Sequence, residues 1–149
     1  MIEPVVVEVN TKKSPQDAFS FFIEKMHLFW PMGHSVGETP RTAMMIEMQE
    51  GGRWYEVCGT QECDWGRVLD FIEGEHVRFA WHLNADWMFD PEKYSEVLVS
   101  FEASADGTVV KLVHSKLENF GENAAQVRAS LASDTGWLDI MSGFEKAAA

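Results

Sequence analysis

The chain has 149 residues and a mass of 16.9 kDa, and its 12 basic and 24 acidic residues give a formal net charge of −12. This length predicts a single domain over residues 1–149, large enough to bury a sizeable hydrophobic core. The negative charge argues against nucleic-acid partners, whose phosphates are bound through Lys and Arg, and against anionic membrane surfaces.

The first ten residues, MIEPVVVEVN, contain neither a basic segment nor a long apolar run, so we expect no secretory signal peptide. No stretch approaches the roughly 20 apolar residues that cross a bilayer. We therefore expect a cytoplasmic protein. In that compartment Cys58 and Cys63 should stay free thiols, although the short turn between them would allow a disulfide.

The first elements follow from a β-branched run and a helix-start signal. Residues 5–9 predict an opening or edge strand. Ser14 is a good N-cap and Pro15 suits the first helical position, so a helix should begin here and carry an apolar stripe through Met26. Pro31 should end the segment, because the residue before a proline is pushed out of helical geometry. Residues 31–41, with two glycines and two prolines, predict a loop.

The middle of the chain alternates large aromatic residues with charged or small ones, which is the period of a β-strand. Turn residues such as Gly74 and Asp106-Gly107 separate the runs, so they should pair as an antiparallel meander. The expected strands are residues 43–48, 53–57, 63–72, 76–83, 96–103 and 108–116. Residues 86–94 predict a longer polar and aromatic excursion between two of them.

Residues 122–147 predict one long C-terminal helix, with Gly136 interrupting the pattern at a kink or at a close approach to the sheet. A twisted antiparallel sheet has one face to bury, and this helix is the element available to cover it. The space between the two would be filled by side chains or left as a cavity.

This order of elements and its motifs resemble the helix-grip fold of the SRPBCC superfamily, which includes the START, birch-pollen-allergen-like and polyketide cyclase proteins. Within it, the chain is similar to the single-domain form of the branch related to the activator of heat-shock protein 90 ATPase. The residues that carry the resemblance are Ser14-Pro15, Ala18-Phe19, Phe29-Trp30-Pro31, Gly51-Gly52-Arg53-Trp54, Trp65-Gly66-Arg67-Val68, Phe79-Ala80-Trp81, Gly107-Thr108, Val110-Lys111-Leu112-Val113-His114-Ser115 and Gly136-Trp137.

The resemblance implies an α+β helix-grip domain in which a curved antiparallel sheet of about six to seven strands wraps around a long C-terminal helix. Relatives often bind hydrophobic ligands beneath that helix, and the polyketide cyclases and aromatases do chemistry there. No catalytic motif comes with this branch, and no cofactor is expected. The co-chaperones that name the branch carry a second, N-terminal domain. This chain begins almost directly at its first expected strand, which argues against a heat-shock protein 90 partnership.

Alternation along the strands assigns side chains to the two faces of the sheet. Phe79 and Trp81 should point inward, as should Phe101 and, on the last strand, His114. By the same rule Trp54 shares a face with Glu56. Trp65 shares one with Arg67 unless Gly66 marks a bulge that shifts the register.

Together with the loop residue His34, the inward set gives a candidate ligand site of aromatic rings and a few polar groups. The candidate ligand-binding residues are Trp30, His34, Trp54, Glu56, Arg67, Phe79, Trp81, Phe101, His114 and Trp137. The loops at residues 31–41 and 86–94 would form the mouth. Structural interpretations stay open for each: Glu56 and Arg67 as an ion pair or facing solvent, His114 as a hydrogen-bonded core histidine, and the rings as core.

Other chemistries lack a motif. The five histidines are scattered without metal-ligand spacing, and no nucleophile elbow, phosphate loop or dinucleotide fingerprint occurs. The leading hypothesis is therefore a binding domain for a small hydrophobic molecule held between sheet and helix, with no evident catalysis and no metal. The alternatives are a co-chaperone-like module that binds a chaperone or another protein, and a cyclase- or hydratase-type enzyme using Glu56, Arg67 and His114.

Overall fold

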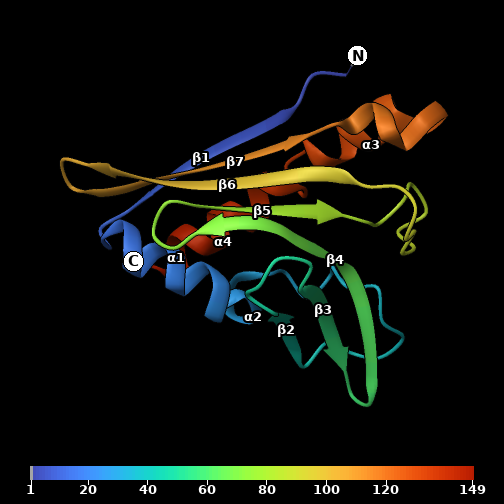
Figure 1. Ribbon diagram of the computed structural model, residues 1–149, viewed down its shortest axis with the longest axis horizontal. Coiled ribbons are helices and arrows are strands. Elements are labelled where there is room, and N and C mark those ends of the chain that lie inside the picture. Colours follow the sequence, from blue (N-terminus) through green and yellow to red (C-terminus); the bar gives the residue numbers. More distant parts are fainter. Residues whose placement is uncertain (1) are drawn as a thin grey trace.

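A computed structural model describes residues 2–149 and shows one curled antiparallel sheet partly enclosing helices (Figure 1). Within these residues the seven strands are hydrogen-bonded in the order β1-β7-β6-β5-β4-β3-β2. They are β1 (Val5–Thr11), β2 (Ala43–Ile46), β3 (Arg53–Cys58), β4 (Gln61–Ile72), β5 (His76–Trp81), β6 (Ser95–Ser104) and β7 (Gly107–Ser115). The helices are α1 (Pro15–Glu24), α2 (Met26–Phe29), the 3-10 helix η1 (Leu117–Asn123), α3 (Ala124–Leu131) and α4 (Trp137–Ala147). The predicted α+β helix-grip architecture is confirmed.

Strand β4 bends the sheet, because it runs along β5 and then turns away with β3 and β2 (Figure 1). Two irregularities in its pairing explain the bend. Opposite β3 the register passes from Asp64 to Gly66 and skips Trp65, and opposite β5 it passes from Val68 to Asp70. An extra residue on one strand increases the local twist and bends it. Gly66 permits the close pairing with β5, since a Cβ there would lie 1.9 Å from the carbonyl oxygen of Ala80.

The first helix begins as its sequence predicts. The side chain of Ser14 accepts a hydrogen bond from the backbone N–H of Asp17 at 3.2 Å, and Pro15 opens α1. The helix is interrupted at Lys25, after which the single turn α2 leads to Trp30, whose backbone is extended before Pro31. The buried face of α1 and α2 supplies Phe22 and Phe29 to the core.

The prediction of one long C-terminal helix over residues 122–147 is wrong, because the segment is broken into η1, α3 and α4. The break falls at Gly136, whose backbone angles (φ −91°, ψ −134°) are not helical. A Cβ at this position would lie 2.2 Å from the carbonyl oxygen of Leu131, so only glycine lets the chain fold back against the end of α3. Gly136 therefore approaches the preceding helix rather than the sheet. None of the helices in residues 2–149 is both long enough and apolar enough to span a membrane.

The interval between α4 and the sheet is filled by the protein's own side chains. Phe144 packs against Phe29 and Phe22, with ring centroids 5.2 and 5.6 Å apart, and Phe22 in turn contacts Phe101. Met141 and Phe144 are fully buried. Of the two outcomes expected for the space between sheet and helix, this part of it is filled. A cavity lies at the N-terminal end of α4, where Trp137 and Ile140 contribute to its wall.

Candidate functional site

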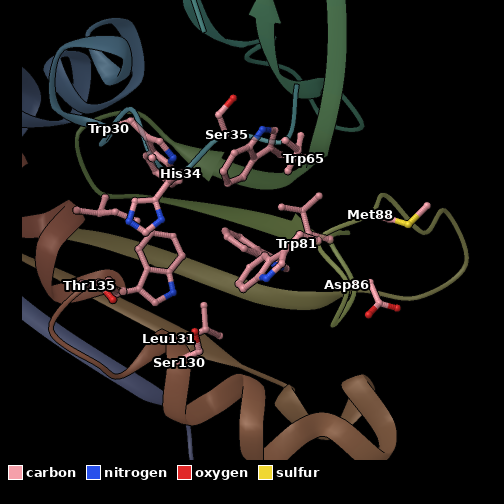
Figure 2. Close-up of a pocket in the computed structure, with 17 residues that line it drawn as sticks. Trp30, His34, Ser35, Trp65, Trp81, Asp86, Met88, Ser130, Leu131 and Thr135 are labelled. Atoms are coloured by element: carbon pink, nitrogen blue, oxygen red, sulfur yellow. The ribbon is translucent and has the colours of Figure 1, made fainter. Parts of the chain in front are cut away.

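The main cavity of the described residues has a volume of about 560 Å³ and lies where α3, α4 and two loops meet the bent part of the sheet (Figure 2). We name the loops that border it the first rim loop (residues 30–42) and the second rim loop (residues 82–94). The first contributes residues 33–36 to the wall and the second contributes Asp86, Trp87 and Met88. The side of α3 and α4 supplies Leu131, Gly136 and Ile140, among others.

Tryptophan rings form the floor of this cavity, which we call the tryptophan cavity. Trp30, Trp65, Trp81 and Trp137 all line it. In the circular order Trp30, Trp65, Trp81, Trp137 and back to Trp30, the centroids of neighbouring rings are 5.3, 5.6, 5.4 and 5.7 Å apart. Three of these four pairs are nearly perpendicular. At these separations the rings touch and leave no room for a guest between them. They therefore make a continuous aromatic surface, and Trp54 packs against three of them without lining the cavity.

The indole N–H groups of this cluster are satisfied unevenly. Trp65 donates to a carboxylate oxygen of Glu56 at 2.8 Å, and Trp137 donates to Nδ1 of His114 at 2.9 Å. The Nε1 atoms of Trp30, Trp54 and Trp81 are buried and have no hydrogen-bond partner within residues 2–149. An unpartnered buried donor costs about 1–3 kcal/mol. Three of the five indoles in the cluster therefore pack without a partner for their N–H group in the described chain.

Glu56 anchors the first rim loop from below. Its fully buried carboxylate accepts hydrogen bonds from the Ser35 hydroxyl and from the Val36 backbone N–H, the latter at 2.6 Å. The indole of Trp65 and the thiol of Cys58 donate to the same carboxylate. Burial by itself would raise the pKa of Glu56, but these four hydrogen bonds hold that pKa below its ordinary value.

Arg41 fastens the same loop from its other end. Its buried guanidinium donates to the backbone carbonyls of Trp30, Pro31 and His34, with the last contact at 2.9 Å. Burial lowers the pKa of Arg41, while the nearby charge of Glu56 acts in the opposite direction. The loop at the cavity mouth is therefore held by one buried anion and one buried cation, although it contains no helix or strand.

The second rim loop places large apolar side chains at the cavity edge. Asn84 closes a tight turn, because its side-chain oxygen accepts from the backbone N–H groups of Asp86 and Met88. Within the turn Trp87 has φ of +60°, a left-handed conformation that is rare for a bulky residue. The side chains of Trp87 and Met88 are 44% and 65% exposed. The turn thus presents apolar surface to solvent at the lip of the cavity.

His114 lies beneath the floor rather than in the cavity. Its Nδ1 accepts the indole N–H of Trp137, so a neutral ring carries its proton on Nε2, 2.7 Å from the Ser95 hydroxyl. Burial lowers the pKa of His114 to about 3. The residue is a neutral core histidine that fixes the orientation of Trp137.

His34 is the histidine that reaches the cavity. Figure 2 shows its imidazole on the same side as Trp30, across the cavity from Asp86. Its Nε2 lies 3.9 Å from a carboxylate oxygen of Asp139, which stands in the first turn of α4. The backbone of His34 is held by Arg41, as described above, so the imidazole projects from a fixed position.

The structure brings four of the candidate residues from the sequence to the cavity wall: Trp30, His34, Trp81 and Trp137. The other candidates lie elsewhere. Trp54, Phe79 and His114 form the layer beneath the floor, Glu56 sits behind the first rim loop, and Phe101 belongs to the phenylalanine cluster under α4.

Arg67 points away from the cavity and contacts Asp64 and the ring of Phe89. The bulge at Trp65 explains this placement: it turns Trp65 inward and Arg67 outward, so the two do not share a face. Arg67 therefore does not pair with Glu56.

Several wall residues were not among the sequence candidates. Trp65 could have been found, since Gly66 already indicated a possible bulge. Val36, Trp87 and Met88 lie in the two loops that were expected at the mouth. Leu131 and Ile140 had no local signal, because the break between α3 and α4 brings them to the wall.

Metal and thiol chemistry find no support among the described residues. No group of three or more His, Cys, Asp or Glu side chains within residues 2–149 could hold a metal ion. Cys58 and Cys63 form no disulfide. Burial raises the pKa of the Cys58 thiol and that of Cys63, which disfavours the nucleophilic thiolate.

Comparison with known proteins places this geometry among related folds. The family profile described as "Activator of Hsp90 ATPase homolog 1-like protein" matches residues 12–149. No match is found among curated proteins. Among solved structures, the chain is similar to the anthrahydroquino-Gama-pyrone synthase Txn09, with 27% identity, 97% of this chain and 96% of that chain covered, and a TM-score of 0.68.

Two further solved structures are similar over nearly their whole length. The self-sacrificing resistance protein CalC from Micromonospora echinospora is 25% identical, with 97% of this chain and 93% of that chain covered and a TM-score of 0.70. The Aha1 dimer from Colwellia psychrerythraea is 14% identical, with 99% and 96% covered and a TM-score of 0.65. The last likeness concerns the fold alone.

Proposed function

Because the chain belongs to the family of activator of Hsp90 ATPase homolog 1-like proteins, we propose that it binds a small hydrophobic aromatic molecule in the tryptophan cavity. The observation that carries the proposal is the floor of four touching indoles beneath about 560 Å³ of space. Ligand pockets typically measure about 300–1,000 Å³ and are lined by apolar and aromatic side chains with a few polar groups.

The energetics of the floor support a binding role. Filling a core requires apolar volume, and phenylalanine supplies it without a polar atom. The buried N–H groups of the floor residues Trp30 and Trp81 instead have no partner within residues 2–149, at about 1–3 kcal/mol each. A role as a broad aromatic surface under the cavity explains why tryptophan occupies these positions, although packing alone would not favour it over phenylalanine.

The charge around the cavity limits the class of ligand. None of the wall residues in the described chain is Lys or Arg, and Asp86 stands at the edge. The chain as a whole carries a net charge of −12. We therefore expect a neutral aromatic molecule rather than an anion. The name of the similar synthase Txn09 denotes a fused-ring oxygenated product, which favours polycyclic compounds as probes.

Titration of tryptophan fluorescence with anthraquinone tests this proposal, with lauric acid as a non-aromatic comparison. The rings of the floor should be quenched by anthraquinone, and the melting temperature should rise. Gly33 provides a blocking variant, because it lines the cavity and a Cβ there meets no atom within 4 Å. Gly33→Phe should abolish binding and Gly33→Ala should keep it. Equal binding by both variants, or none by the wild type across a panel of polycyclic aromatics, would refute the proposal.

The alternatives from the sequence gain less support. Partnership with a chaperone stays a prediction, since the 14% identity to the Aha1 structure supports the fold alone. The enzymatic alternative relied on Glu56, Arg67 and His114, none of which lines the cavity. Any proton transfer in this cavity needs a different group.

A further inference from the structure

An imidazole stands at the wall of the tryptophan cavity, and a carboxylate that does not line the cavity lies beside it; this arrangement is the basis of our inference. His34 comes from the first rim loop, and Asp139 comes from the first turn of α4. Nε2 of His34 and Oδ2 of Asp139 are 3.9 Å apart. The two side chains are 32% and 51% exposed, so they are neither locked in the core nor fully solvated.

Asp139 lies beside only one of the two ring nitrogens of His34, Nε2. An ionised carboxylate only accepts hydrogen bonds, so it favours the tautomer of His34 that carries its proton on Nε2. Nδ1 then keeps its lone pair, and no hydrogen bond engages it in the part of the chain that the structure describes. A wall residue of the cavity thus carries a ring nitrogen with a free lone pair, while a carboxylate lies beside its other ring nitrogen.

We infer that the tryptophan cavity is a proton-transfer site, in which His34 takes the proton of an acidic hydroxyl on a bound aromatic molecule. This inference rests on the proposed binding function and names its ligand class, neutral hydroxyaromatic compounds. In the step, the ligand O–H bond breaks and its electron pair stays on the oxygen. An N–H bond forms at Nδ1, giving an imidazolium. The proton returns to the oxygen when the ligand leaves.

The surrounding charges are compatible with this step. Asp139 on α4 has a carboxylate oxygen 3.9 Å from Nε2 of His34, and Asp86 lies across the cavity from His34 (Figure 2). Arg41 donates to the backbone carbonyl of His34, and Glu56 lies behind Ser35 with its own hydrogen bonds satisfied. No cation therefore lines the wall to bind a ligand that is already anionic. A ligand enters neutral and becomes charged only beside His34.

Two probes test the inference, one with an ionisable hydroxyl proton and one without it. 2-Hydroxyanthraquinone absorbs at longer wavelength once its hydroxyl is ionised, and 2-methoxyanthraquinone has no such proton. Bound to the wild type, the hydroxy compound should ionise at a pH about one unit below its value in free solution, which is a tenfold change in the equilibrium. His34→Gln should abolish this shift and weaken binding of the hydroxy compound about tenfold more than binding of the methoxy compound.

Asp139→Asn should reduce the spectral shift and also leave binding of the methoxy compound unchanged. His27→Gln, at an exposed histidine on α2, is the matched control and should behave as wild type. Identical ionisation of the hydroxy probe on the wild type and on His34→Gln would overturn the inference while the binding function stands. If the wild type binds neither probe, the binding function falls, and the proton-transfer step falls with it.

Discussion

The carboxylate of Glu56 makes two kinds of hydrogen bond, and this asymmetry leads to a sharp prediction. Oε1 accepts the backbone N–H of Val36 at 2.6 Å and the indole N–H of Trp65 at 2.8 Å. Oε2 accepts from the hydroxyl of Ser35 and from the thiol of Cys58, the latter at 3.0 Å. The two N–H groups can only donate, whereas the hydroxyl and the thiol can also accept.

Glu56→Gln should therefore be tolerated. The amide oxygen can replace Oε1, and the amide NH₂ can donate to the hydroxyl and the thiol. The variant loses the negative charge of the carboxylate, which strengthens its hydrogen bonds about twofold and partly compensates the positive charge of Arg41. We therefore expect the free energy of unfolding to fall by about 1–2 kcal/mol. Glu56→Ala leaves two buried N–H groups without an acceptor at about 1–3 kcal/mol each. We expect it to lower the free energy of unfolding by about 3–5 kcal/mol.

Urea unfolding at pH 7, followed by tryptophan fluorescence, measures both costs. The pH dependence provides a second check, because the pKa of Glu56 is lower in the folded protein than in the unfolded chain. Its stabilising contribution is complete above the unfolded value of about 4.3 and is lost as the pH falls through the folded pKa. The gap between wild type and Glu56→Gln should shrink there. Equal damage by Gln and Ala at pH 7 would refute the reasoning.

Three further predictions concern other parts of the molecule. His114, with a pKa of about 3, stays neutral in the folded protein but is protonated in the unfolded chain below about pH 6.5. The free energy of unfolding should therefore fall on acidification by up to about 1.4 kcal/mol per pH unit, and His114→Leu should flatten this slope. Trp87→Gly should raise the unfolding free energy by about 0.5–1 kcal/mol by relieving its left-handed backbone, and should weaken anthraquinone binding. Gly136→Ala should destabilise by about 1–3 kcal/mol, because its Cβ would collide with the carbonyl of Leu131, whereas Gly33→Ala should be neutral.

Urea unfolding at several pH values tests the prediction for His114. Urea unfolding at pH 7 tests the predicted stabilities of Trp87→Gly and Gly136→Ala. An unchanged slope between pH 6.5 and 5 in His114→Leu would contradict the buried neutral histidine. A loss of stability in Trp87→Gly would show that its packing outweighs its strain. Wild-type stability in Gly136→Ala would mean that the helix break does not require glycine.

Local pattern was sufficient to determine the elements and the inward face of the sheet. Ser14 and Pro15 start α1 as predicted, because capping depends only on neighbouring residues. Alternation placed Phe79, Trp81 and His114 on the buried face, because a strand turns its side chains to opposite sides regardless of its partners.

The position of the cavity was decided only by the tertiary structure. Gly136 was a visible interruption, but whether it bends a helix or breaks it depends on how closely the chain returns to Leu131. The bulge at Trp65 depends on its pairing with β3, and that single extra residue reverses the faces of Trp65 and Arg67. Sequence spacing does not specify such long-range contacts. It predicted a space between the sheet and one continuous helix, whereas phenylalanine rings fill this space under the later part of α4 and the cavity lies at the helix break and the first turn of α4.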